Sequence, residues 1–369
     1  MKSPRLPYVC SLAATAVLAL APLHATAQNE QGAVFVMTNA ASNNQIRSYT
    51  RSGDGSLDFA GAFATGGNGS GGTVDPLHSQ GSLTLSADHR LLFAVNASSG
   101  TVSSFAVRGA SLLLLDTEPT GGSMPTSVTQ VGDLVYVLNA GGNGSVSGFH
   151  ILGNGHLLPI KNSTRYLSGS ASGPTDVVLS PNTQFLIVAE SATNTIDVFR
   201  VFPDGTLSNP LTTDSAGATP FAAVFSPAGA LIVGNASNTI SSYQLDWNGS
   251  LRTVSNALPT DGLATCWDVI GRFGRSVYTS NAMSSTLSGF DIGRDGELTP
   301  IGDTVVGQNP TGSTNIDVAA SDDGRYLYTL NAAAGVIGIF AVQEDGSLVN
   351  LGQQDGLPAS SGMNGIAAY

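Results

Sequence analysis

Residues 230–251 read ALIVGNASNTISSYQLDWNGSL, and residues 91–112 read almost the same phrase, LLFAVNASSGTVSSFAVRGASL. Each copy has an apolar run that ends in Asn, an alternating apolar and polar run, and a turn followed by leucine. Alternation with a period of two is typical of a β-strand whose two faces meet different environments. Asn-Gly and similar pairs tolerate the positive φ of tight hairpin turns. The phrase therefore predicts consecutive antiparallel strands.

The phrase occurs seven times along the chain. Its apolar run ends at Asn39, Asn96, Asn139, Glu190, Asn235, Asn281 and Asn331. The spacing between these anchors varies from 43 to 57 residues, which lies in the range of propeller blades. Most copies are preceded by a further strand, so each unit holds four strands, with the first strand innermost.

The two ends of the repeat array complement each other. The first unit begins directly at its second strand, AVFVMTN at residues 33–39, whereas the chain finishes with NGIAAY at residues 364–369, an unpartnered first strand. Pairing the two closes a ring and leaves no open sheet edge at the join. We therefore predict an all-β, seven-bladed β-propeller in one domain, residues 28–369. The alternative, an open β-solenoid, needs capping units at both ends.

Residues 1–27 have the features of a cleaved secretory signal peptide. Lys2 and Arg5 precede an apolar run that is too short for a bilayer span, and Ala-Thr-Ala at residues 25–27 suits signal peptidase. We expect an exported protein, periplasmic or extracellular, with no membrane insertion.

The charge and the cysteine content of the chain argue against several classes of binding partner and cofactor. The formal charge of −12 becomes −14 once the signal peptide is removed, which argues against nucleic acid and anionic membranes. After cleavage Cys266 is the single cysteine, so no intrachain disulfide is possible. The chain lacks zinc-type His and Cys spacing and a Gly-x-Ser-x-Gly elbow. We expect no metal, no cofactor and a monomer.

The repeats resemble those of a known family. Residues 180–207, SPNTQFLIVAESATNTIDVFRVFPDGTL, and residues 321–348, SDDGRYLYTLNAAAGVIGIFAVQEDGSL, show the pattern most plainly. They resemble the lactonase family of seven-bladed propellers, which includes 6-phosphogluconolactonases and relatives of carboxymuconate cyclases. The resemblance covers almost all of residues 32–369 and implies hydrolysis of a lactone.

The resemblance also indicates where a site is expected. Enzymes of that family carry an Arg-Gln pair and then a Pro-His-x-His stretch at the start of an inner strand. The comparable segment here, residues 165–181, matches the Arg with Arg165 but has Thr175 and Asp176 where the imidazoles are expected. Most arginines fall in the turns of one face of the disc, here called the lower face. Since phosphate recognition uses Arg or Lys, a phosphosugar is disfavoured.

The opposite, upper face carries the connections between second and third strands and those between blades. Glu190 breaks the Asn pattern there, so it is either a neutral replacement or a general base near the channel. His78 and Asp75 lie in an unusually long upper-face loop, where His78 is either a solvated residue or a general base. Arg165 completes the predicted catalytic set, for polarising a carbonyl group.

Four further residues are candidates for ligand binding. Trp267 either stacks on a sugar ring or packs in the core, and Asp75 accompanies His78. Asn139 and Asn235 ring the channel, although an Asn at such a turn commonly hydrogen-bonds its own backbone. Cys266 is expected to be a small buried residue rather than a nucleophile.

Two functions therefore remain open. The first is a lactonase-like hydrolase acting on a non-phosphorylated sugar or aromatic lactone. The second is a non-catalytic propeller that binds a glycan, peptide or protein on its upper face.

Overall fold

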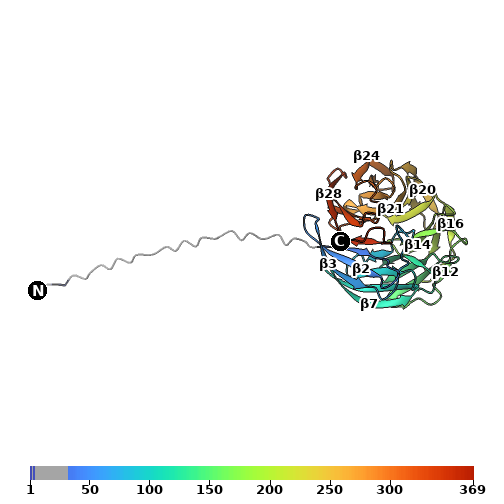
Figure 1. Cartoon of the computed structure of the whole chain (residues 1–369), viewed down its shortest axis with the longest axis horizontal. Helices are drawn as coiled ribbons and strands as arrows, with labels where there is room; N and C mark the ends of the chain where they lie inside the picture. The colour runs from blue at the N-terminus through green and yellow to red at the C-terminus, as the bar shows by residue number, and fades with distance from the viewer. Residues whose placement is uncertain (2, 5–31) are drawn as a thin grey trace.

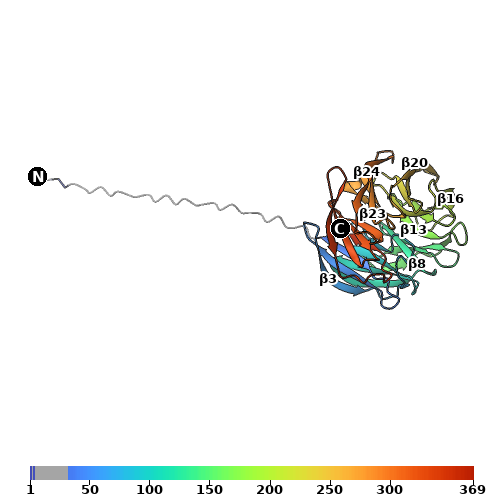
Figure 2. The same ribbon diagram turned by 45° about the horizontal axis from the view of Figure 1, so that its top comes forward.

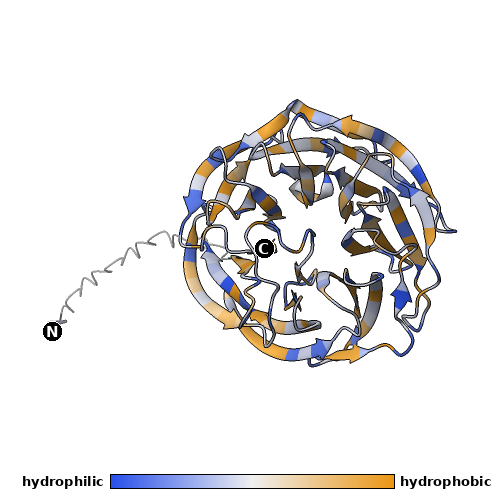
Figure 3. Ribbon diagram, turned by 45° about the vertical axis from the view of Figure 1, so that its right-hand side comes forward, coloured by the Kyte–Doolittle hydropathy of each residue, from blue (hydrophilic) through white to orange (hydrophobic). Residues whose placement is uncertain are grey.

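The structure is a computed structural model that describes residues 1, 3–4 and 32–369. The predicted signal peptide therefore lies almost entirely outside the described residues. Within the described part, seven antiparallel sheets form a ring (Figures 1 and 3), so the predicted seven-bladed propeller is confirmed. No helix among these residues is long and apolar enough to cross a bilayer.

The blades follow the repeats, and each first strand contacts the first strands of both neighbouring blades. Blade 1 consists of β29 (Ile366–Ala368), β1 (Gly32–Met37), β2 (Gln45–Arg51) and β3 (Leu57–Ala64). Blade 2 consists of β4 (Leu83–Leu85), β5 (Leu91–Asn96), β6 (Thr101–Arg108) and β7 (Ser111–Pro119). Blade 3 consists of β8 (Pro125–Val131), β9 (Leu134–Asn139), β10 (Ser145–Ile151) and β11 (Leu157–Pro159), and the short β12 (Arg165–Tyr166) also pairs with β10.

The remaining blades have the same plan, with one 3₁₀ turn, η1 (Arg272–Gly274), after β21. Blade 4 consists of β13 (Pro174–Leu179), β14 (Phe185–Glu190), β15 (Thr195–Arg200) and β16 (Leu211–Asp214), and blade 5 of β17 (Pro220–Phe225), β18 (Leu231–Asn235), β19 (Thr239–Leu245) and β20 (Leu251–Pro259). Blade 6 consists of β21 (Thr265–Gly271), β22 (Ser276–Asn281), β23 (Thr286–Ile292) and β24 (Leu298–Gln308). Blade 7 consists of β25 (Asn315–Ala320), β26 (Tyr326–Asn331), β27 (Val336–Val342) and β28 (Leu348–Gln354).

The ring closes as the sequence predicts. β29 pairs antiparallel with β1, with Val36 opposite Ile366, so the C-terminal strand lies beside the N-terminal one (Figure 2). The buried Arg51 donates from Nε to the Tyr369 carbonyl oxygen at 3.0 Å and from Nη1 to Asp323 at 3.1 Å. This closed sheet excludes the open solenoid.

The repeated Asn has a structural role within its blade. Asn281 is fully buried; its Oδ1 accepts a hydrogen bond from Thr265 at 2.6 Å, and its Nδ2 donates to Ser288 at 2.8 Å. Asn96 makes the same pair of bonds within blade 2 and its neighbouring loop. In these two blades the buried amide has both of its groups satisfied, and it ties the second strand to the third strand and to a neighbouring threonine.

Neighbouring blades are linked by tyrosines that reach the next blade. Tyr136 Oη donates to the Gly205 carbonyl at 2.7 Å, and Tyr328 Oη donates to the Gly55 carbonyl at 3.0 Å across the closure. Gly55 has a φ of 86°, and a Cβ placed there would lie 2.5 Å from the Tyr326 ring. Glycine therefore satisfies both the turn and the close contact between blades.

Candidate active site at the upper face

The channel is crossed by the loop between β3 and β4, which has 18 residues, whereas the β7–β8 connection has five. Ser79 Oγ donates to the Thr126 carbonyl in blade 3 at 2.8 Å, and Gln80 N donates to the Thr175 carbonyl in blade 4 at 3.0 Å. Trp267 Nε1, in blade 6, donates to the Ser79 carbonyl at 3.1 Å. The loop therefore bridges the inner strands of three blades, and His78 lies on its outward side.

His78 is held on the upper face by this loop. Its backbone has a φ of 49°, and its side chain is 64% exposed. The imidazole packs edge-on against the Phe221 ring, with 4.9 Å between ring centres. It lines a cavity of about 300 Å³ together with Met124, Ser172 and Pro174. A supported imidazole that faces a cavity can accept a proton from a bound water molecule.

Asp75 lies beneath His78 and is largely buried. The distance between Asp75 Oδ2 and His78 Nδ1 is 3.9 Å, and Asp75 Oδ1 accepts a hydrogen bond from Asn364 Nδ2 at 2.9 Å. Burial raises the pKa of Asp75 to about 7, whereas desolvation lowers the pKa of His78. At neutral pH His78 is therefore the unprotonated base, and Asp75 is placed to stabilise its protonated form.

Trp267 lies below this pair and not in the cavity. The residue is 2% exposed, and its ring packs edge-on against Phe221 at 5.0 Å between centres. Phe221 in turn contacts His78, so Trp267 supports the imidazole indirectly. Asn139 and Asn235 are fully buried; Asn139 accepts a hydrogen bond from Thr120 in the β7–β8 connection, and Asn235 donates to Ser241 within its own blade.

Glu190 forms a buried acidic pair with Asp197. Its Oε2 accepts hydrogen bonds from Ser168 Oγ at 3.0 Å and Thr195 Oγ1 at 2.8 Å. Burial raises the pKa of Glu190, and the Asp197 charge adds to the effect. Ser168 N also donates to Asp197 Oδ2 at 2.8 Å, so Ser168 bridges the two acids. In blade 6 the same positions hold the neutral pair Asn281 and Ser288.

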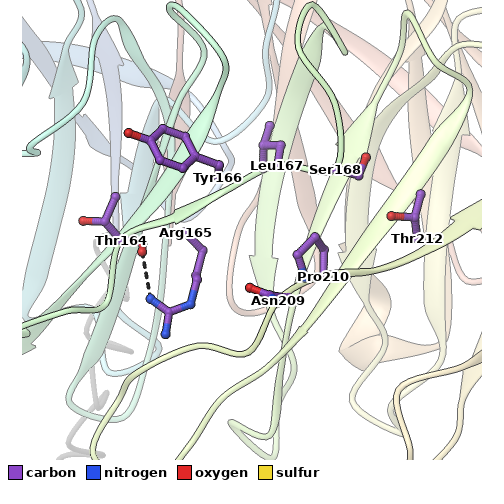
Figure 4. A pocket seen from close by; sticks show the side chains of 8 residues that line it. All are labelled: Thr164, Arg165, Tyr166, Leu167, Ser168, Asn209, Pro210 and Thr212. Carbon is purple, nitrogen blue, oxygen red and sulfur yellow. Dashed lines mark hydrogen bonds between the residues drawn. The ribbon is translucent and has the colours of Figure 1, made fainter.

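Arg165 lines a second cavity, of about 480 Å³, at the outer edge of blades 3 and 4 (Figure 4). Its Nη1 donates to the carbonyl oxygens of Asn162 and Thr164, both at 2.9 Å. Ser168 lines this cavity too, in front of Glu190. Arg165 and His78 therefore face different cavities, and Glu190 lies buried beside the segment that separates them.

The inner strands also place three carboxyl groups around the channel that sequence reasoning did not select as a group. Asp176, Asp268 and Asp317 are nearly fully buried, and burial raises their pKa values to about 7, 7 and 8. Asp176 Oδ2 accepts a hydrogen bond from Ala223 N at 2.9 Å, and its Oδ1 from Ser127 at 2.9 Å. An acidic residue within an otherwise apolar inner strand is the sequence signal for such a group.

Asp176→Asn is expected to make the protein more stable at and above neutral pH. The amide keeps an oxygen for the Ala223 N–H and directs its own N–H toward Ser127. Because the folded-state pKa is raised, the carboxyl group contributes fully to stability below about pH 4, and this contribution is lost as pH rises through about 7. The gain should therefore grow from pH 4 to 7, reach about 4 kcal/mol, and then level off.

Urea unfolding of the wild type and the variant between pH 4 and 8.5 measures this difference. Asp58→Asn, at an exposed position, serves as the matched control and should change the free energy of unfolding little at any pH. A difference between Asp176→Asn and wild type that stays constant with pH would show that Asp176 is not protonated in the folded state.

Comparison with known proteins identifies the family that the chain resembles. Residues 161–267 match the family described as Lactonase, 7-bladed beta-propeller. No curated protein sequence matches the chain.

Among solved structures, a periplasmic gluconolactonase from Pseudomonas aeruginosa is 20% identical, with a TM-score of 0.68 over 91% of this chain and 99% of its own. A protein from Bacteroides uniformis, proposed to be a 6-phosphogluconolactonase, is 20% identical, with a TM-score of 0.71 over 93% of this chain and all of its own. A Lactobacillus plantarum protein is 21% identical, with a TM-score of 0.71 over 92% and 98% of the two chains. At these identities the structural likeness shows the fold alone. The match over residues 161–267 agrees with the resemblance predicted from the repeats, and the fold of the chain is a seven-bladed β-propeller like that of these structures.

Proposed function

We propose that this protein is exported and hydrolyses a non-phosphorylated sugar or aromatic lactone in the cavity beside His78. The observation that carries the proposal is the exposed imidazole at 3.9 Å from a buried aspartate on the upper face. Such a pair supplies a base for water and a counter-charge for the imidazolium that forms. The family resemblance supplies the reaction class, since a lactone is a cyclic ester.

In the proposed reaction His78 accepts a proton from water as the water oxygen attacks the lactone carbonyl carbon. Asp75 then stabilises the protonated imidazole. When the tetrahedral intermediate collapses, the ring C–O bond breaks and His78 returns the proton to the departing alkoxide oxygen. The products balance as one hydroxy acid from one lactone and one water molecule.

In this proposal Glu190 is a positioning residue, which acts on the cavity through Ser172. Its carboxyl group interacts with Ser172, which lines the His78 cavity, although the Ser172 hydroxyl makes no hydrogen bond of good geometry. Arg165 would contact only a ligand that extends into the neighbouring cavity. Trp267 acts through Phe221, and Asn139 and Asn235 act by holding the upper-face turns.

The lining of the His78 cavity indicates the substrate class. It contains apolar residues such as Leu77 and Met124 together with Asn143 and Ser172, and neither Lys nor Arg. A phosphate group normally requires such a cation. The volume of about 300 Å³ lies at the lower end of the range for ligand pockets, which suits a single ring.

An assay against a panel of lactones tests the proposal. We expect the protein recovered from the exported fraction, beginning at Gln28, to open glucono-, galactono- or aromatic lactones and to leave 6-phosphogluconolactone unchanged. Release of acid, measured by pH-stat titration, gives the rates. Turnover of the phosphorylated lactone alone would contradict the assignment of substrate class, and no turnover of any lactone would contradict the activity.

One observation favours the second candidate function, binding without turnover. Thr175 and Asp176 stand where the related enzymes have imidazoles, and both are buried and engaged in the fold. Thr175 Oγ1 donates to the Phe221 carbonyl at 2.7 Å. Measurable affinity for a glycan, peptide or lactone at the His78 cavity, with no product formed, would establish this alternative.

A further inference from the structure

Trp247 is an exposed aromatic residue that the fold does not require. It occupies the tip of the third-to-fourth strand turn of blade 5 and is 83% exposed. The turn is held by Asn248 Oδ1, which accepts a hydrogen bond from Ser250 N at 3.0 Å. Blade 1 builds the same turn with Asp54 and Ser56, also at 3.0 Å. The positions equivalent to Trp247 in other blades hold Gly53, Gly153, Pro203, Arg294 and Glu344. The repeat therefore provides internal controls in which the turn forms without an indole.

The Trp247 backbone is anchored although its side chain is exposed. Arg200 Nη2 donates to the Trp247 carbonyl at 2.7 Å, and the Arg200 guanidinium carbon lies 5.0 Å from the centre of the Phe185 ring. Phe185 is 3% exposed and belongs to the core between blades 4 and 5. The indole is therefore carried by a fixed turn, which lowers the entropic cost of using it in binding.

A cavity of about 390 Å³ lies beside this indole, between blades 4 and 5. Blade 4 contributes Asn182 and Gln184, and blade 5 contributes Phe225 and Asp246. Asn182 Oδ1 accepts hydrogen bonds within its own turn, from Ser180 Oγ at 2.8 Å and Gln184 N at 3.1 Å. The lining therefore combines aromatic faces with amide and carboxylate groups. It includes neither Lys nor Arg.

We propose that this cavity on the lower face binds a neutral saccharide. The C–H face of a sugar ring packs on an exposed indole, while amide and carboxylate side chains hydrogen-bond to its hydroxyl groups. The Asp246 carboxylate and the lack of a lining cation disfavour an anionic ligand. The amide and carboxylate side chains in the lining disfavour a purely apolar ligand, because such a ligand would leave them without hydrogen-bond partners. Trp247 supplies the stacking surface, and Asn182, Gln184 and Asp246 supply the polar contacts.

This site is separate from the proposed reaction site. The residues of the saccharide cavity lie in first-to-second and third-to-fourth strand turns and at the strand ends beside them, on the lower face, whereas His78 lies in a connection between blades, on the upper face. The proposal therefore does not depend on lactone hydrolysis. His78→Ala should leave saccharide affinity unchanged, and Trp247→Ala should leave turnover of a small lactone unchanged.

Intrinsic fluorescence tests the proposal, because the chain has two tryptophans and Trp267 is buried. The full exported protein is titrated with cellohexaose, xylohexaose, maltohexaose and chitohexaose, and calorimetry measures each Kd. We expect at least one to bind with a Kd of about 1 mM or tighter and to shift the Trp247 emission to the blue. Trp247→Ala should weaken that binding at least about tenfold, and Trp247→Phe should weaken it less.

Two results would overturn the site. One is the absence of binding to all four oligosaccharides. The other is binding that persists unchanged in Trp247→Ala, which would place the saccharide elsewhere. Since the indole is exposed, the alanine variant should fold, and near-ultraviolet circular dichroism of Trp267 confirms this in the same samples.

Discussion

Replacing His78 with alanine should reduce kcat/KM for the lactone substrate by about 10²–10⁴-fold, the usual contribution of a positioned general base. The fold should survive, because the imidazole is largely exposed and packs only edge-on against the Phe221 ring among the aromatic residues that the structure describes. His150→Ala provides a matched control, since His150 lies on the opposite face and pairs with Asp133. Initial rates at fixed enzyme concentration measure the effect.

The pH profile separates a catalytic role for His78 from a structural one. Because the pKa of His78 is lowered, its imidazole loses its proton at a pH below 6.5, the ordinary pKa of histidine. Asp75 ionises near pH 7, so kcat/KM should rise in two steps as pH increases from 5 to 8. Asp75→Asn should remove the upper step. Full activity of His78→Ala with an unchanged profile would rule out this base.

Removing residues 364–369 is expected to abolish cooperative folding. The deletion strips β29 from β1 and exposes the backbone of a central strand, and it removes Ile366, whose burial alone contributes about 2–3 kcal/mol. It also takes Tyr369 from the buried Arg51. Losses of this size approach the total stability of a typical domain, about 5–15 kcal/mol. Thermal unfolding followed by circular dichroism, together with the soluble yield, measures the effect.

A pair of point variants provides the control. Ile366→Asp places a charge in the closed inner strand, whereas Val349→Asp places one in β28, where the side chain is 48% exposed. The first should lower the melting temperature strongly and the second little. Adding a synthetic peptide of residues 363–369 to the truncated protein should restore part of the transition. Equal melting temperatures for truncated and full-length protein would contradict closure by the C-terminal strand.

The candidate site is predictable from the sequence only in part. A loop of unusual length that interrupts the repeat points to His78 and Asp75, and the structure places their side chains 3.9 Å apart. A break in the sevenfold Asn pattern points to Glu190, but no sequence pattern pairs Glu190 with Asp197. Asp197 replaces a serine of the third strand, and its significance depends on which residues face each other across two strands.

The two tryptophans show what a linear pattern leaves out. Trp267 was selected for its place at the start of an inner strand, yet it is 2% exposed, because Phe221 and the channel loop cover it. No sequence pattern distinguishes Trp247, because it lies in the same type of turn as the other units have. Its significance comes from exposure and from a cavity made by two different blades.

The seven-bladed ring, its closure and the order of its strands were predictable from the sequence alone, because period-two alternation and turn chemistry are local requirements that recur in every unit, and a buried Asn recurs in six of the seven. The tertiary structure alone decided which side chains share a cavity: it directed Arg165 and His78 into different ones. Packing decides this, since the chain path of a long loop and the contacts between blades depend on residues that lie far apart in the sequence.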